Sequence, residues 1–256
     1  MDDHLRLPGR LPGTLPTILM IAASWLVMVV LVTGSHDRIM AHDAMLAGRL
    51  LPSLPTLLLF LAAWQVMTGA MMLPSSLPMI RLFAATSRNQ EHPSLVLAVF
   101  LGAYFVVWTG FAVAALVADA GLHLIVDHMA WLDRHPGTIT GAVLIGAGAF
   151  QFSPLKEQCL EACRSPLAFL YQHYGRGVRR AWDLGLRHGL FCLGCCWALM
   201  LVMFAVGIGS LAGMAALTGV MAIEKAFPWG HRLVPVVGVG LIGLGLIEML
   251  PGVSLV

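Results

Sequence analysis

Seven long apolar segments constrain the fold of this chain more than any other feature of its sequence. A membrane-spanning helix needs about 20 mostly apolar residues. Hydrophobic residues make up 59% of the chain and charged residues only 11%, which is not the composition of a soluble domain. We therefore predict an all-α, polytopic membrane helix bundle of about seven spans, with residues 1–256 forming a single membrane domain. The predicted spans are Leu15–Thr33, Leu54–Leu73, Leu95–Val117, Ile139–Phe152, Leu190–Gly207, Leu211–Phe227 and Leu233–Leu250.

The distribution of lysine and arginine predicts how these spans are oriented. If residues 1–14 are a cytoplasmic N-terminus, twelve of the 15 Lys and Arg residues fall in cytoplasmic segments, as the positive-inside rule expects. Half of those twelve lie in residues 153–187, which we interpret as a basic cytoplasmic loop that also carries two cysteines. The net charge of +2 is too small to indicate a nucleic acid partner.

All five cysteines gather in the basic loop and at the start of the fifth span. The three cysteines of that span share a helix face with His188, within an arc of roughly 100°. The two cysteines of the loop lie four residues apart on a short helix, which Ser153 caps and Ser165-Pro166 ends. Thiols on the cytoplasmic side stay reduced, so they are available to a metal ion. The predicted ligands are Cys159, Cys163, His188, Cys192, Cys195 and Cys196.

Sulfur ligands in this number favour a soft transition metal. Thiolates and thioethers select Cu(I), and zinc is the next candidate because cysteine and histidine sets form tetrahedral zinc sites. The second span adds Met67, Met71 and Met72 just before Pro74 and Pro78, two prolines that should break or kink the helix. These methionines are either a metal relay within the bundle or flexible core filler.

Histidines and aspartates are frequent in the predicted outer loops. The stripe of Asp119, His123 and Asp127 has helical spacing, so a solvated amphipathic helix on the membrane explains it. Capture of metal ions before transfer inward is the alternative. The residues proposed for capture are His36, His42, His123, Asp127 and His128.

Two further predictions concern the remaining spans. Tyr104 and Trp108 of the third span indicate aromatic packing without a chemical role. Glu224 and Lys225 form a charged pair near the inner end of the sixth span. A charge at membrane depth suggests a functional role, although Lys225 could also extend to the cytoplasm while Glu224 faces the bundle.

Three motifs together resemble a bacterial family of predicted metal-binding integral membrane proteins, which is classed as a domain of unknown function. They are W-x-V-M-x-x-A-M-M-x-P from Trp64 to Pro74, S-P-L-K-x-x-C-L-x-x-C-R-S-P from Ser153 to Pro166, and H-G-x-x-C-L-G-C-C-W from His188 to Trp197. The resemblance extends from about the second span to the sixth. It implies a metal-binding role and no particular mechanism.

Three functions fit these features. The first is binding, and transport or delivery, of Cu(I) or zinc in a bacterial inner (plasma) membrane, with a metallochaperone or metalloprotein as partner. The second is a membrane thiol–disulfide oxidoreductase that uses Cys192 and Cys195 with Cys159 and Cys163. The third is an assembly scaffold for a membrane metalloenzyme. We expect no catalytic residues for the first and third functions, and the sequence leaves the oligomeric state open.

Overall fold

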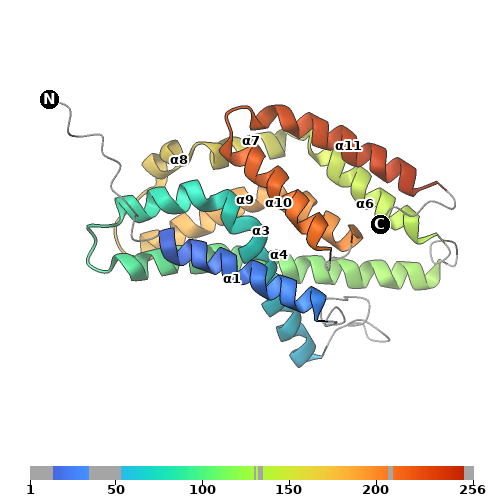
Figure 1. The fold of residues 1–256 in the computed structure, drawn as a ribbon, viewed down its shortest axis with the longest axis horizontal. Helices are drawn as coiled ribbons and strands as arrows, with labels where there is room; N and C mark the ends of the chain where they lie inside the picture. Colours follow the sequence, from blue (N-terminus) through green and yellow to red (C-terminus); the bar gives the residue numbers. More distant parts are fainter. Residues whose placement is uncertain (1–13, 35–52, 130, 132–134, 207–209, 251–256) are drawn as a thin grey trace.

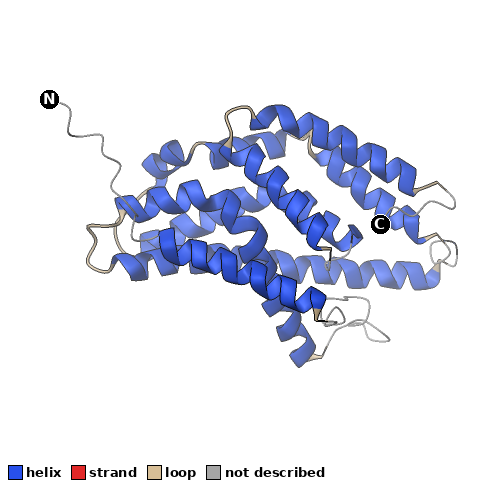
Figure 2. Ribbon diagram, viewed as in Figure 1, coloured by secondary structure: helices blue, strands red, loops and turns tan. Residues whose placement is uncertain are grey.

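The computed structural model describes residues 14–34, 53–129, 131, 135–206 and 210–250. This part of the chain contains helices and turns but no strand (Figure 2), which confirms the predicted all-α bundle. Figure 1 shows how the helices are arranged. They are α1 (Thr14–Thr33), α3 (Leu54–Thr86), α4 (Pro93–His128), α6 (Pro136–Phe150), α7 (Pro154–Arg164), α8 (Pro166–His173), α9 (Val178–Val206), α10 (Leu211–Ala226), the 3-10 turn η2 (Gly230–Arg232) and α11 (Leu233–Glu248).

Among the described residues, five helical segments are long and apolar enough to cross a membrane. They are α1, α3, α4, α9 and the segment Gly230–Glu248 that contains α11. A sixth crossing results if α6 and α7, which meet at a bend of 64°, form one broken span. The chain is therefore a multi-pass membrane protein with five or six candidate spans, where the sequence predicted seven. The difference arises because α6 has 15 residues and α10 has 16, fewer than the roughly 20 that a span requires.

The start of α7 follows the sequence prediction closely. Ser153 is its N-cap, and the Ser153 hydroxyl accepts hydrogen bonds from the backbone N–H groups of Leu155 (3.1 Å) and Lys156 (3.3 Å). Pro154 occupies the first turn, where its missing N–H costs nothing. Ser165 ends the helix, and Pro166 begins α8. These local signals, which do not depend on tertiary contacts, place both loop cysteines on one short helix.

Pro74 and Pro78 lie inside α3, and the helix continues through both of them. Figure 1 shows that the ribbon of α3 changes direction along its length. Because Pro74 has no N–H, the carbonyl of Ala70 loses its helical partner. The indole N–H of Trp25 on α1 donates to that carbonyl at 2.9 Å. The bend of α3 is thus supported by a neighbouring helix, which membrane helices with proline require.

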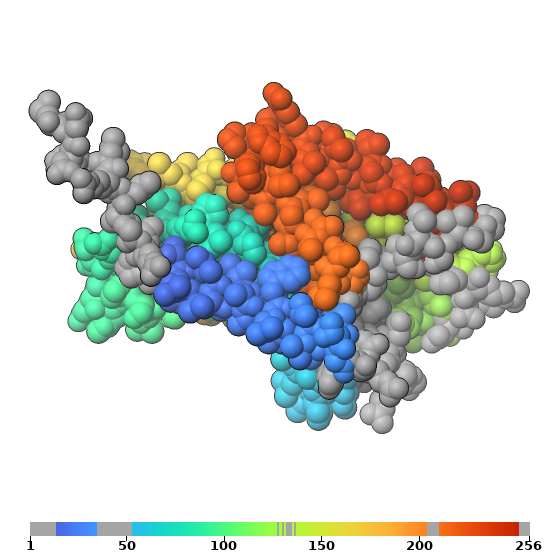
Figure 3. Space-filling view, in the orientation of Figure 1, coloured from blue at the N-terminus to red at the C-terminus, as the bar shows by residue number. Residues whose placement is uncertain are grey.

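Helix α9 lies at the centre of the arrangement and packs against α4, α6 and α7. Glycine makes this packing close: a Cβ at Gly185 would overlap with the Phe100 carbonyl and the Ala103 side chain of α4, and one at Gly189 would lie 2.9 Å from Val107. Helix α10 packs between α3 and α9, and the space-filling view shows it beside α1 on one face (Figure 3). The bundle therefore brings α3, α4, α7, α9 and α10 around one buried centre.

Two boundaries differ from the sequence prediction. The stripe around Asp119 and His123 belongs to the last turns of α4 rather than to a separate surface helix. The basic segment before the cysteines is likewise the beginning of α9, which starts at Val178 and includes Arg179 and Arg187. In both cases the helix continues past the apolar segment, because a hydrophobicity pattern marks the membrane boundary and not the end of the helix.

Candidate metal centre

The cysteines of α9 are fully enclosed by neighbouring helices. Cys192, Cys195 and Cys196 have exposed fractions of 0%, 1% and 1%. The predicted helix over this segment is confirmed, so the spacing places all three on the inward side. The Sγ atoms of Cys195 and Cys196 lie 3.3 Å apart, and Cys195 also donates to the backbone carbonyl of Cys192 at 3.2 Å.

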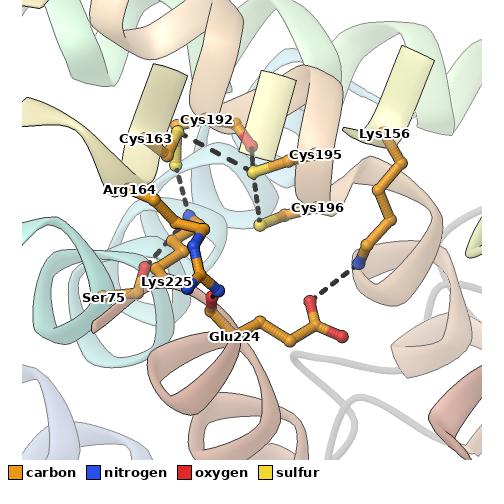
Figure 4. A network of polar contacts seen from close by, with 9 residues as sticks. All are labelled: Ser75, Lys156, Cys163, Arg164, Cys192, Cys195, Cys196, Glu224 and Lys225. Carbon is orange, nitrogen blue, oxygen red and sulfur yellow. Dashed lines mark hydrogen bonds and ion pairs between the residues drawn. The ribbon is translucent and has the colours of Figure 1, made fainter. Parts of the chain in front are cut away.

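A fourth thiol reaches this group from α7. The Sγ atom of Cys163 lies 3.9 Å from that of Cys195, although the two residues are 32 positions apart in the chain. Figure 4 shows the sulfur atoms of the two helices facing each other. We refer to Cys163, Cys192, Cys195 and Cys196 as the four-thiol cluster. The sequence prediction that the loop cysteines and the fifth-span cysteines converge is thus matched by the position of Cys163.

Cys159 lies one turn earlier on α7 and contacts α9 at a different point. A Cβ atom on Gly194 would overlap with the Sγ atom of Cys159 and lie 3.3 Å from its Cβ. Gly194 therefore makes room for Cys159 between the two helices. Cys159 is buried, and it lies beside the four-thiol cluster rather than within its chain of sulfur contacts.

The third span contributes a polar group that no local sequence pattern assigns to the site. The hydroxyl of Tyr104 on α4 lies 3.1 Å from the Sγ atom of Cys192. Ser76 of α3 lies 3.8 Å from the same sulfur and 3.3 Å from the Tyr104 hydroxyl. Cys192 thus has hydroxyl neighbours from two other helices, which can donate to a thiolate at this position.

Lys225 of α10 points into the cluster and not toward the outside of the bundle. Its ammonium nitrogen lies 3.1 Å from the Sγ atom of Cys192 and 3.1 Å from the hydroxyl of Ser75. The exposed fraction of Lys225 is 6%. Of the two alternatives considered from the sequence, the structure supports a charge within the bundle over extension to water.

Glu224, the preceding residue, faces the other way. Its Oε2 atom accepts a hydrogen bond from the ammonium of Lys156 on α7 at 2.7 Å, and both side chains are 1% exposed. Arg164 of α7 donates to the backbone carbonyls of Glu224 and Pro228, each at 2.8 Å. These contacts fasten α7 to the end of α10 (Figure 4), and they hold Cys163 and Lys225 on facing sides of the cluster.

His188 is buried in an aromatic setting one turn before Cys192. Its ring stacks on Phe100 and Tyr104, with centroid distances of 5.9 and 5.6 Å, and meets the edge of Phe169 at 6.1 Å. Its Nε2 atom has no hydrogen-bond partner within the described part of the chain. A buried nitrogen without a partner is costly. A ligand bound to this Nε2 atom would remove that cost.

The three methionines predicted as a relay are all completely buried. Met67, Met71 and Met72 lie on α3, one to two turns before Ser75. Further methionines are equally buried on α9, which carries three of the thiols, and on α10, which carries Lys225: Met200 and Met203 on α9, and Met214 and Met221 on α10. All of them belong to one core. This set is larger than the three methionines that the sequence predicts as a relay.

The residues proposed for outer metal capture are only partly described. His36 and His42 lie outside the described residues, as does the side chain of Asp127. The Nδ1 atom of His123 lies 3.0 Å from the backbone carbonyl of Asp119, and that of His128 lies 2.7 Å from the carbonyl of Leu124. These contacts are within one helix, so outer capture stays a prediction.

The donor atoms suit a soft metal ion, but they are not arranged as a completed shell. Within the described residues, no group of three or more His, Cys, Asp or Glu side chains could hold a metal ion as placed. The cluster instead offers close pairs of sulfur atoms. Its thiols are all free, and three of the four are shielded from water, which does not favour an oxidoreductase because disulfide exchange needs an accessible thiolate.

The similarity of this chain to a known protein family bears on the function of the site. A family model described as a copper chaperone, PpoB2, matches residues 61–248. That range includes the four-thiol cluster, Lys225 and the buried methionines. No curated protein and no solved structure matches the chain. The description agrees with the metal-binding role that the sequence motifs implied, and the metal that it names is copper.

Proposed function

The chain belongs to the copper chaperone family, and on that premise we propose that it carries Cu(I) on the four-thiol cluster for delivery to another protein. The observation that carries this proposal is the approach of Cys163 on α7 to Cys195 on α9, at 3.9 Å between sulfur atoms. Copper is here the cargo. Cys159 and His188, which the sequence also predicted as ligands, lie beside the four-thiol cluster, and the proposed site does not require them.

The chemistry of the surroundings supports Cu(I) over harder ions. Glu224, the acidic residue next to Lys225, is engaged by Lys156. What remains beside Cys192 are sulfur, hydroxyl and ammonium groups. Thiolate-rich sites select Cu(I), whereas carboxylate and water sites suit magnesium, calcium or manganese. A dry sulfur site also protects a bound Cu(I) ion from exchange with solvent.

Metal analysis of the purified membrane protein tests this function. The variant is the triple substitution Cys192→Ser, Cys195→Ser and Cys196→Ser, and the matched control is Cys159→Ser, outside the sulfur chain. We expect the wild type to retain Cu(I), the triple variant to lose it, and the control to keep most of it. Equal copper in wild type and triple variant would refute the proposal, and zinc in place of copper would refute the choice of metal.

We further propose that buried methionines take the ion from the cluster toward the opposite side of the membrane. Met221 lies one turn from Lys225, Met200 one turn from Cys196, and Met72 one turn from Ser76. Met67 lies five residues before Met72, and Met214 lies seven residues before Met221. With a rise of 1.5 Å per residue, they extend this set by about 7–11 Å along α3 and α10. Thioethers bind Cu(I) without charge and more weakly than thiolates, which suits ligands that must release their ion.

The relay is tested by separating binding from transfer. The triple variant Met67→Leu, Met71→Leu and Met72→Leu keeps side chains of similar size, so the core should pack normally. We expect unchanged Cu(I) content after purification, together with slower transfer of copper to a chelator across a vesicle membrane. A transfer rate equal to that of the wild type would contradict the relay and leave the thiol site unaffected.

The location and the partner are also proposals. We propose that the protein resides in a bacterial inner membrane, with the α7–α8 segment on the cytoplasmic side, because the lysines and arginines concentrate there. The acceptor would be a copper-requiring metalloprotein, as delivery implies.

A further inference from the structure

Lys225 is a buried cation without a matching carboxylate. Its ammonium contacts a thiol and a hydroxyl, and no acidic side chain in the described part of the chain lies within ion-pair distance of it. The neighbouring Glu224 is committed to Lys156. An unpaired charge at membrane depth is expensive and marks a functional position. The sulfur atoms are therefore the groups that can balance this charge.

The charge of the loaded cluster depends on how many thiolates bind the ion. One Cu(I) held by two thiolates carries a charge of minus one, and the ammonium of Lys225 neutralises it. A third thiolate would leave a net negative charge in a region shielded from water, which is costly. A buried cation next to the thiols thus favours two-coordinate Cu(I).

The arrangement of the sulfur atoms agrees with a two-ligand site. The sulfur atom of Cys195 lies 3.9 Å from that of Cys163 and 3.3 Å from that of Cys196, so close pairs of thiols are present. Zinc sites use four ligands in a tetrahedron, which this cluster would form only after rearrangement. A site for two-coordinate Cu(I) needs a single pair.

We infer that Lys225 is the charge partner of a copper site that binds one Cu(I) ion through two thiolates of the four-thiol cluster. This inference rests on the proposed copper function and specifies its coordination. On binding, two Cu–S bonds form, two S–H bonds break, and two protons leave to water. The oxidation state of copper does not change. Lys225 acts as a positioning residue, because its ammonium contacts Cys192, a member of the four-thiol cluster, and not the ion.

The test combines two variants with a spectroscopic measurement. Lys225→Met keeps the length of the side chain and removes its charge, while Lys225→Arg keeps the charge. We expect Lys225→Met to weaken Cu(I) binding by about a hundredfold, since a unit charge a few ångströms away acts at moderate dielectric, and Lys225→Arg to retain most of it. X-ray absorption of the loaded wild type should give two sulfur neighbours per copper ion.

Several outcomes would overturn the inference. Wild-type Cu(I) affinity in a folded Lys225→Met variant would remove the role of the charge. Three or more sulfur neighbours in the wild type would remove the two-thiolate site, and this measurement decides even if Lys225→Met does not fold. Failure of the copper function itself is distinguishable, because it would appear as equal copper content in the wild type and the triple cysteine variant.

Discussion

Two buried lysines illustrate how single residues define this protein. Lys156 pairs with Glu224 at 2.7 Å, whereas Lys225 contacts Cys192 and Ser75. Each ammonium is shielded from water, so each depends on the groups that face it. The first pair fastens α7 to α10, and the second contact ties α10 to the thiols. The adjacent residues Glu224 and Lys225 of α10 therefore have different roles. Glu224 belongs to a structural ion pair, whereas Lys225 supplies a charge at the four-thiol cluster.

Breaking the buried ion pair should destabilise the whole domain. In Glu224→Gln the ammonium of Lys156 loses its counter-charge, and we expect the free energy of unfolding to fall by about 3–5 kcal/mol. Unfolding of the purified protein in detergent measures this change. The exposed pair of Arg187 and Asp183, at 3.1 Å, provides the control: Asp183→Asn should cost less than about 1 kcal/mol. Similar losses in both variants would contradict the argument.

At the scale of elements, α3 shows how a membrane helix accommodates proline. Pro74 deprives Ala70 of its helical donor, and Trp25 of α1 supplies a replacement at 2.9 Å. Ser75 in turn donates to the carbonyl of Met72 at 2.9 Å. The proline segment therefore has two structural effects: it bends α3, and it places two serines beside the cluster.

Removal of the indole donor should matter only while Pro74 is present. We expect Trp25→Phe to lower the free energy of unfolding by about 1–3 kcal/mol, because the buried carbonyl of Ala70 is left without a partner. In a Pro74→Ala background the new N–H can bond to that carbonyl, so the same substitution should cost less. A double-mutant cycle measures the difference, and equal costs in both backgrounds would refute the hydrogen-bond explanation.

At the scale of the whole molecule, function depends on which side of the membrane the cluster opens to. The basic residues predict that α7, α8 and the start of α9 face the cytoplasm, while the end of α4 faces outward. Tyr171 on α8 is 91% exposed and Trp131, beyond α4, is 57% exposed. A label at each of these two positions should therefore report on opposite sides of the membrane.

Labelling of introduced cysteines tests this orientation. We expect Tyr171→Cys to react with a membrane-impermeant maleimide only after lysis of spheroplasts, and Trp131→Cys to react in intact ones. The physical reason is that an impermeant maleimide reaches only the thiols on the side of the membrane to which it is added. The wild type controls for its own cysteines, which are mostly buried. The reversed pattern would invert the predicted topology and place the cluster toward the outside.

The sequence by itself determined the helical class, most helix positions and the candidate ligands, because these depend on local properties. Apolar length, proline and serine caps, and thiol chemistry act over a few residues, and they sufficed for α7 and for the cysteine face of α9. The number of spans was predicted less well, because α6 and α10 are apolar enough for a span but too short to form one. Local signals set what each helix is.

Only the tertiary structure decided which residues meet. The sequence indicates only packing for Tyr104, and for Lys225 either a bundle charge or a residue extending to water, yet both contact Cys192. The two serines between Pro74 and Pro78, polar groups at membrane depth, were the available signal for this centre. Contacts between residues 33 to 150 positions apart depend on how helices pack, and glycines such as Gly185 and Gly194 set that packing through their missing side chains. No local pattern encodes such distances, so the cluster exists only in the folded bundle.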